Sequence, residues 1–550
     1  MHAGAPRPLS RHRKRIAKPI ELRLSKTKRL ALVGEGLIVG IVVGLAIALY
    51  RFALSHAEEL LRFVTQLLVQ WGPAVLLWFG MLAILCLLVG RLLLLEPFTQ
   101  GSGIPQLDAE VAGRIDMPWA RVVPIKMVEG VLCAFAGLSL GREGPSVLLG
   151  GMLGKGVSRV FGERRGHERY LVTCGAAAGM SAAFHAPLTG VLFAVEEIHK
   201  EFSAPLVISA MTSSVAADYV SSNILGIEPL IHFMTYSMVP HQLYPWVLLM
   251  GLVCGLLGAA HNKGMFWVQD HIFGPLERYP IYVRLAIPFF LAGVAAFAFP
   301  DLMCGGDAIV ERVLDVPAQT LGMLAMLLVG KYVFTAICFG SGAPGGTLLP
   351  LVVMGSLVGA IYGICAMRIA QVPEAYVNSF IVLGIAGMFS SVIQAPVTGV
   401  VLVFELTGSL EALLATSLVS IMAYVVSGLV DGEPFYEHLY GRLIGRQSQE
   451  SQDLPQRHAG GEKLVRTYVL SPGSCMEGRA IRDIRWPQNV LVVTIRRGGT
   501  ELVAKGDCVM AALDELTVVF DVAREDQTHT ALRELCAPAV ADEPEAPSAT

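Results

Sequence analysis

The sequence has 550 residues, of which 54% are hydrophobic and only 16% are charged, and its mean hydropathy is +0.58. This composition excludes an ordinary soluble protein of several domains and predicts an integral membrane protein. The 42 basic and 45 acidic residues leave a formal net charge of −3. That balance excludes a nucleic-acid-binding protein that works by neutralising phosphates.

The charges are distributed unevenly along the chain. Residues 1–30 carry ten Lys and Arg and one acidic residue, residues 31–440 carry 47 charged residues, and residues 451–550 carry 26. We therefore expect five parts: a basic N-terminal segment (1–29), a membrane domain (30–445), a linker (446–462), a small domain (463–536) and a disordered tail (537–550).

The basic segment precedes an apolar run, Ala31 to Tyr50, that is long enough to span a bilayer and has no convincing small-residue cleavage site. We therefore expect this segment to remain attached. The positive-inside bias places it in the cytoplasm.

Seven apolar segments approach the length of about 20 residues that a membrane helix needs: 31–50, 74–95, 244–260, 282–300, 319–339, 350–371 and 411–430. Three further stretches, 123–160, 170–198 and 378–406, are apolar but contain Gly or Pro every few residues. Interrupted backbone is tolerated inside a bilayer only where it is buried in protein or lines a water-filled cavity. These stretches therefore indicate a transport site.

An internal repeat supports a transporter. Residues Gly175 to Glu196 match Gly384 to Glu405 at an offset of 209, and a weaker match at an offset of 201 relates 141–154 to 342–355. Two related halves with interrupted segments in corresponding places are typical of transporters whose site lies at the repeat interface. The repeat alone leaves open whether the halves are inverted or parallel.

Three stretches rich in Gly and Pro stand where helices are expected to begin: GSGIP at 101–105, GREGP at 141–145 and GSGAPGG at 340–346. Glycine lets the backbone approach a ligand, proline suits a first helical turn, and helix N-termini present unpaired N–H groups with partial positive charge. Two or three such ends meeting in the membrane would bind an anion. The alternative is that these residues only permit close helix packing.

Glu143 favours the anion site. It lies in the second motif, just before the apolar run Val147 to Leu149, and a charge at mid-bilayer costs about 2.5–3.5 kcal/mol on insertion scales, which indicates a functional residue. Its carboxylate could occupy the position of a permeating anion and leave it once protonated. The alternative is a surface-loop glutamate balanced by Arg142.

Glu196 and Glu197 end the apolar run Leu188 to Val195. Helical neighbours differ by about 100°, so the two side chains cannot face the same way. Glu196 corresponds to Glu405 in the repeat, which predicts a shared structural role such as capping or pairing, whereas Glu197 is special to its half. The alternative has both glutamates in solvent at the membrane edge.

The histidine at 185 and the cysteines are predicted to have structural roles. We expect His185 to be a hydrogen-bonded packing residue, and the ten scattered cysteines to be small packing residues without a metal or disulfide role. Glu35 and Lys331 lie within long spans, and the sequence assigns neither a partner.

Over residues 30–445 the chain resembles the CLC family of chloride channels and chloride/proton antiporters. The resemblance rests on GSGIP at 101–105, GREGP at 141–145, AAFHAPLTGVLFAVEE at 182–197 and GSGAPGGTLLP at 340–350. It implies an all-α polytopic membrane fold of two inverted helical repeats, about 30–225 and 240–445, with interrupted, tilted helices. It also implies a homodimer in which each subunit has its own pore.

The resemblance further implies residue roles. Chloride would be bound by the hydroxyls of Ser102 and Tyr436, by Gly103, and by backbone amides near Thr347 and Leu348. Glu143 would be the external gating glutamate, and Glu197 the internal proton-transfer glutamate typical of the antiporters. The third motif departs from the family's usual GxFxP because Leu348 replaces the phenylalanine, which leaves pore width and anion selectivity open.

The C-terminal part reads as a small α+β domain. We expect strands at Leu464 to Leu470, Val490 to Ile495, Glu501 to Ala504 and Leu516 to Asp521, and a helix at Gln527 to Cys536. This segment resembles the TrkA-C (RCK-C) regulatory module. The resemblance implies a cytoplasmic module that dimerises or binds a small regulatory ligand; a plain stabilising appendage is the alternative.

The function expected is a chloride/proton antiporter in the inner (plasma) membrane, multi-pass, with both termini in the cytoplasm. Its partners would be chloride, protons, the lipid bilayer and a second copy of the chain, with no nucleic acid. The C-terminal domain shows no nucleophile–base constellation or phosphate loop. Neither an enzyme nor a cofactor nor a metal is expected. The alternatives are a passive voltage- or pH-gated chloride channel and a membrane sensor with vestigial transport; the intact motifs oppose the sensor.

Overall fold

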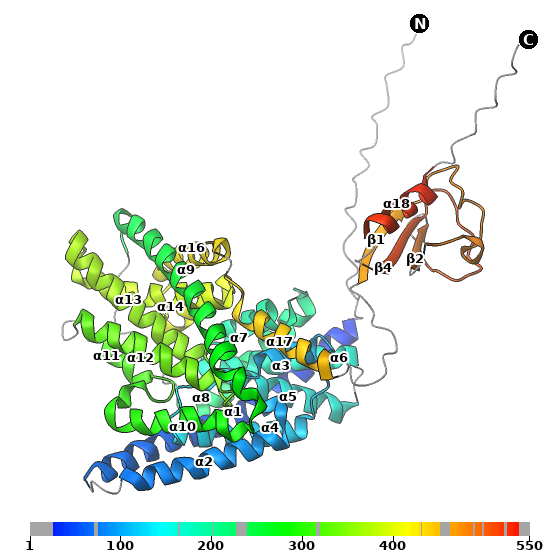
Figure 1. The fold of residues 1–550 in the computed structure, drawn as a ribbon. Helices are drawn as coiled ribbons and strands as arrows, with labels where there is room; N and C mark the ends of the chain where they lie inside the picture. Colours follow the sequence, from blue (N-terminus) through cyan, green and yellow to red (C-terminus); the bar gives the residue numbers. More distant parts are fainter. Residues whose placement is uncertain are drawn as a thin grey trace, which may run out of the picture. The chain divides into compact units, whose positions relative to one another are not determined.

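The computed structural model describes residues 26–70, 75–162, 165–200, 202–226, 239–314, 320–430, 432–450, 463–487, 490–497, 500–521 and 525–537. The chain divides into two compact units, Met1–Gln447 and Ser448–Thr550 (Figure 1). Residues 1–25 of the expected basic segment, 451–462 of the expected linker and 538–550 of the expected tail lie outside the described residues.

The first unit is helical. Its first half contains α1 Lys26–Gln70, α2 Val75–Leu95, α3 Ile104–Val111, α4 Trp119–Phe135, α5 Glu143–Phe161, α6 Arg165–Phe184, α7 Pro187–Phe193, a π-helical turn Ala194–His199, and α8 Ala204–Leu225. Its second half contains α9 Tyr244–Trp267, α10 Ile281–Ala298, α11 Asp307–Leu314, α12 Leu321–Gly340, α13 Leu348–Ala370, α14 Val377–Ile393, α15 Pro396–Thr407, α16 Leu413–Leu429 and α17 Phe435–Glu450.

Corresponding helices pack in the same way in both halves. In the first half α5 packs on α6, and α6 packs on α1, α7 and α8; in the second half α13 packs on α14, and α14 packs on α9, α15 and α16. Helices α2 and α10 correspond to each other and run side by side along one edge of the unit (Figure 1).

The two halves are inverted. Glu196, just after α7, bonds to Thr398 in the first turn of α15, and Glu405, near the end of α15, bonds to Thr189 in the first turn of α7. The end of each helix therefore meets the start of its repeat partner, which requires the two to run antiparallel. The antiparallel backbone bridge between Gly141 and Gly346 likewise brings α5 and α13 together at their N-termini. The inverted fold implied by the family resemblance is confirmed.

Eight helices among the described residues are long and apolar enough to cross a membrane. The seven predicted spans correspond to α1, α2, α9, α10, α12, α13 and α16, and α1 continues beyond its predicted end to Gln70. The eighth comes from the stretch 378–406, for which the sequence predicts interruptions throughout. Helix α14 is instead continuous through Gly384 and Gly387.

Glycines in α6 and α14 serve close packing. A Cβ at Gly384 would lie 2.4 Å from the Gly355 carbonyl oxygen on α13, and a Cβ at Gly175 would lie 2.1 Å from the Gly150 carbonyl oxygen on α5. These small residues let helix backbones touch, as is common in membranes. The breaks before Pro187 and Pro396 interrupt the two stretches, whereas the glycines within α6 and α14 permit close packing and leave the helices continuous.

The second unit is α+β. Its four-stranded antiparallel sheet has the order β1-β4-β2-β3, with strands β1 Lys463–Val469, β2 Leu491–Arg497, β3 Thr500–Val503 and β4 Glu515–Asp521. Helix α18, Glu525–Cys536, packs on β1 and β4. All five elements lie within two residues of their predicted bounds. Residues 446–450, expected in the linker, instead belong to the end of α17.

An ion pair joins the end of β2 to the turn before β4. Arg497 donates to both carboxylate oxygens of Asp514, at 2.8 and 2.7 Å, and the Ala511 amide donates at 2.8 Å. Burial alone would raise the pKa of Asp514, but these hydrogen bonds hold its pKa below the ordinary value. Asp514 therefore stays ionised and fixes the turn, which is a structural role.

Candidate functional site

Backbone hydrogen bonds bring the three Gly- and Pro-rich motifs together. The Gly141 amide donates to the Gly346 carbonyl at 2.6 Å, and the Gly346 amide donates back to the Gly141 carbonyl at 2.8 Å. The Gly345 amide also donates to the Gly101 carbonyl at 3.0 Å. Segments about 40 and 200 residues apart in sequence thus form one junction in the membrane unit.

Glycine is required at this junction because side chains would separate the motifs. A Cβ at Gly144 would lie 2.9 Å from the Ser102 Cβ and 3.2 Å from the Gly346 Cα. Gly103 has a φ of +89°, which favours glycine, and a Cβ there would lie 2.5 Å from the Leu148 side chain. These contacts hold the N-termini of α3, α5 and α13 close to one another.

Such an arrangement suits an anion. The first amides of each helix have no partner within their own helix, and the helix dipole adds partial positive charge at the same end. Three N-termini directed at one region would bind a small anion without a permanent cation in contact with it.

Glu143 begins α5 at this junction. Its side chain is 0% exposed, and its carboxylate faces the backbone amides of Glu143 and Leu349. The nearest cation is Arg142, whose Nε lies 3.8 Å from Oε1. A Cβ at Gly141 would lie 2.5 Å from Glu143 Oε2 and 3.1 Å from Leu349 in the first turn of α13. The surface-loop interpretation of Glu143 is therefore wrong.

Two cavities with different lining residues approach the junction. One, of about 110 Å³, is lined by Ser102, Gly101, Phe339 and Arg442 among others. The other, of about 30 Å³, is lined by Tyr50, Gly141, Arg142 and Leu349 among others. They share no lining residue, and Glu143 lines neither. The junction thus separates the two cavities.

The residues predicted to bind chloride are buried here. Ser102 is at the α3 N-terminus, where its Oγ accepts from the Ile104 amide at 3.3 Å. Thr347 precedes α13, and Leu348 begins it; both are buried. Tyr436, in the first turn of α17, is buried. The Tyr436 hydroxyl faces Thr347.

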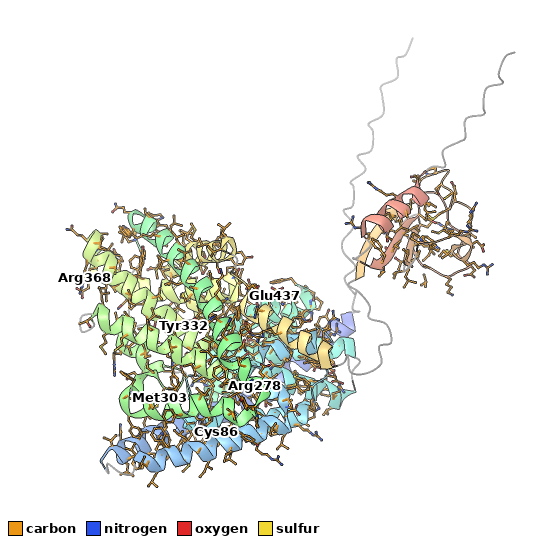
Figure 2. All side chains as sticks on the ribbon, in the orientation of Figure 1. Cys86, Arg278, Met303, Tyr332, Arg368 and Glu437 are labelled. Carbon is orange, nitrogen blue, oxygen red and sulfur yellow. The ribbon has the colours of Figure 1, made fainter. Side chains whose placement is uncertain are left out.

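Glu197 lies apart from Glu143, on the π-helical turn after α7. Its side chain is 8% exposed, and its electrostatic neighbours are Lys200, Asp108, Glu196 and Glu437. Glu437 lies on α17 (Figure 2). The Tyr436 hydroxyl is close enough to both Glu197 and Glu143 to interact electrostatically with each.

Glu196 and Glu405 have the shared structural role that the repeat predicts. Glu196 Oε2 accepts from the Thr398 amide at 3.0 Å and its hydroxyl at 2.7 Å. Glu405 accepts from the amides of Leu188 and Thr189, both at 2.7 Å, and from the Thr189 hydroxyl at 2.6 Å. Each carboxylate caps the opposite repeat's helix. The alternative of two solvated glutamates at 196 and 197 is therefore wrong.

The structure also supplies partners that the sequence left unassigned. Glu35 contacts His167 Nε2 at 2.5 Å, and Lys331 donates to the carbonyls of Leu302 and Cys304. His185 is hydrogen-bonded as predicted, with Nδ1 at 3.0 Å from Asp218 and Nε2 at 3.0 Å from Arg51. All ten cysteines are free thiols.

Sequence reasoning missed two fully buried ionisable residues of α4, Lys126 and Glu129. Lys126 donates to the Thr99 and Gly101 carbonyls next to Ser102, at 2.6 Å each. The signal was present, because both residues stand within the apolar stretch 123–160, where an ionisable side chain is exceptional.

Three carboxylates elsewhere converge enough to suit a metal: Glu110, Asp116 and Glu168. Two cations already occupy this cluster. Lys155 Nζ lies 2.5 Å from Glu110 and 2.6 Å from Asp116, and Arg159 pairs with Asp116 and Glu168. The cluster is therefore an ion-pair network that ties α3, α5 and α6 together.

Comparison with known families identifies the membrane unit. The family model described as voltage gated chloride channel matches residues 79–428, more than half of the chain, and the TrkA-C domain matches residues 465–532. The chain belongs to the voltage-gated chloride channel family. Like other members of this CLC family it is a multi-pass membrane protein.

Relatives within the CLC family include named exchangers. The H(+)/Cl(-) exchange transporter ClcA of Vibrio parahaemolyticus serotype O3:K6 is 30% identical, over 81% of this chain and 99% of the relative. The H(+)/Cl(-) exchange transporter ClcA of Citrobacter koseri is 30% identical, over 79% of this chain and 93% of the relative. The crystal structure of a slow cyanobacterial Cl-/H+ antiporter is 28% identical, covers 76% of this chain and 99% of that chain, and has a TM-score of 0.69. The crystal structure of a eukaryotic CLC transporter shares the fold, with a TM-score of 0.63. It is 22% identical and covers 76% of this chain and 75% of that chain.

Proposed function

We propose that this protein is a chloride/proton antiporter. The observation that carries the proposal is Glu143, a fully buried carboxylate that faces the backbone amides of Glu143 and Leu349 at the meeting point of three helix N-termini. An anion site at which an ionisable carboxylate competes with the permeating anion links anion movement to protonation. The relatives named as H(+)/Cl(-) exchange transporters support this assignment.

In this mechanism the ionised Glu143 carboxylate occupies the anion position at the junction and blocks exchange of chloride between the two cavities. Protonation removes its charge and allows it to leave, so that chloride takes its place. Ser102 and Tyr436 would bind chloride through their hydroxyls, with Gly103 and the backbone at Thr347 and Leu348 completing the site. The burial of Tyr436, whose hydroxyl faces Thr347 just before α13, supports this role.

Glu197 would exchange protons with the other side of the membrane. It is shielded from solvent, stands beside Lys200 and Asp108, and can interact electrostatically with Tyr436. An acidic residue at this place, away from the anion junction, gives protons a route distinct from that of chloride. This supports exchange over a passive voltage- or pH-gated channel. The channel is the second candidate, because it could use the same junction with Glu143 as its gate.

We further propose a homodimer with both termini in the cytoplasm. The basic residues before α1 support this orientation, and the family resemblance supports the dimer. The TrkA-C match supports a cytoplasmic regulatory role for the second unit, with a small regulatory ligand as its partner.

The experiment that separates the two functions is reconstitution into liposomes with a chloride gradient and an internal pH probe. Uphill proton movement driven by chloride is expected. Chloride flux without any proton movement would establish the passive channel instead.

Two variants test the assigned roles in the same liposomes. Glu143→Ala is expected to keep chloride flux and lose proton coupling, because no carboxylate then alternates with chloride. Glu197→Gln is expected to move chloride with little proton movement. Normal coupling in either variant would remove that glutamate from the mechanism.

A further inference from the structure

Glu129 is a buried carboxylate that the proposed mechanism does not use. It lies on α4, its side chain is 0% exposed, and its carboxylate interacts with the Thr99 side chain. An ionisable side chain buried in a membrane helix is costly, which indicates a functional residue.

Its electrostatic partner is Lys126, one helical turn earlier on α4. Lys126 is also 0% exposed, and its Nζ donates to the carbonyls of Thr99 and Gly101 at 2.6 Å each. Residues three apart share a helix face, and Glu129 interacts with Lys126 and with Thr99. Lys126 thus joins the chain segment just before Ser102 to the face of α4 that carries Glu129.

This position makes the Lys126 charge relevant to the anion. Gly101 adjoins Ser102, and its carbonyl also accepts from Gly345 beside the α13 N-terminus. A buried ammonium at this segment raises the electrostatic potential at the junction, and a buried carboxylate one turn away lowers it again. Such effects are strong because little water is present to screen them.

We propose that Glu129 sets the chloride affinity of the junction by balancing the charge of Lys126 beside Gly101 and Ser102. The inference rests on the proposed chloride site. Glu129 acts through Lys126 and the potential that it creates, without touching the anion. Because Glu129 offsets the charge of Lys126, the site binds chloride weakly enough to release it, which transport requires.

Removing the charge of Glu129 leaves Lys126 uncompensated and should tighten chloride binding. A unit charge about 10 Å away at an effective dielectric constant of about 20 changes an affinity by roughly tenfold. Without Lys126, by contrast, the buried Glu129 carboxyl would take up a proton rather than remain an unpaired charge, so its removal should then have no effect.

The test is calorimetric titration of the full-length, detergent-solubilised protein with chloride. Glu129→Gln is expected to bind about tenfold more tightly than the wild type, and Glu129→Met, which needs no hydrogen bond, should do the same if Glu129→Gln does not fold. Lys126→Met and the double variant Lys126→Met/Glu129→Gln should bind equally. The exposed Glu374→Gln is the charge-matched control and should bind as the wild type does.

Two results would overturn the proposal: unchanged or weaker binding in both Glu129 variants, or tightening of the same size when Lys126 is absent. A purely structural role for Glu129 predicts weaker binding and no dependence on Lys126. Ser102→Ala, measured in parallel, tests the proposed chloride site itself. No chloride binding by the wild type, or normal binding by Ser102→Ala, would reject that site and the inference with it.

Discussion

The position of the Glu143 carboxylate depends on the absence of a side chain at Gly141. A Cβ at this residue would lie 2.5 Å from Glu143 Oε2 and 3.1 Å from both Leu349 Cβ and Pro350 Cδ. The first turn of α13 is fixed by packing, whereas the end of the glutamate side chain can move. A methyl group at 141 would therefore displace the carboxylate from the junction.

We predict that Gly141→Ala slows coupled chloride/proton exchange by at least about tenfold while the membrane unit remains folded, since inserting one methyl group costs roughly 1–3 kcal/mol. Liposome flux measures the first effect, and thermal unfolding in detergent measures the second. Gly80→Ala on α2 is the matched control, because no atom lies within 4 Å of its added Cβ. Equal exchange rates in the two variants would contradict the steric argument.

At the scale of helices, the two repeats are joined by exchanged caps. Glu405 near the end of α15 accepts three hydrogen bonds from Leu188 and Thr189 at the start of α7. In the same way, Glu196 accepts two hydrogen bonds from Thr398 at the start of α15. A carboxylate at a helix N-terminus satisfies unpaired amides and complements the helix dipole. The pair therefore fixes the packing of the two inverted halves.

Glu405→Gln should lower the thermal stability of the protein in detergent. The amide can accept fewer of these bonds and carries no charge, and hydrogen bonds to charged groups contribute about 1.5–3 kcal/mol each. Glu196→Gln should have a smaller effect, because both of its bonds are accepted by one oxygen, Oε2, whereas Glu405 uses both of its oxygens. Glu374→Gln, an exposed glutamate, is the control; a loss of stability as large as that of Glu405→Gln would show that the caps do not matter.

The sequence predicts the apolar helices well because a run of about 20 apolar residues is the length that a helix needs to cross a bilayer. It cannot separate a glycine that breaks a helix from one that permits close packing, which is why the sequence predicts interruptions where α14 is continuous. The repeat identifies Glu196 and Glu405 as a pair, yet only the fold shows that each reaches across to the other half. Glu143 is predictable as an isolated charge. The relation of Lys126 and Glu129 to the site, by contrast, is visible only from the hydrogen bond that Lys126 donates to the Gly101 carbonyl.

At the scale of the whole chain, the two units have separate cores. Every residue of the proposed site, from Ser102 to Tyr436, belongs to the unit Met1–Gln447. The second unit has its own cluster of buried apolar residues, including Leu470, Ile495 and Phe520, together with the Arg497–Asp514 ion pair. Among the described residues, the core and the proposed site of the membrane unit consist of residues of that unit.

A protein that ends after Glu450 should therefore keep coupled exchange. This truncation retains the whole of α17, whose buried residues Phe435, Tyr436 and Leu439 anchor it in the membrane unit. In liposomes its ratio of protons to chloride should equal that of the full chain, because the residues that couple the two ions are unchanged. Its turnover rate can differ, because the regulatory role proposed for the second unit concerns the rate. A changed ratio in a folded truncated protein would mean that the second unit takes part in ion coupling itself.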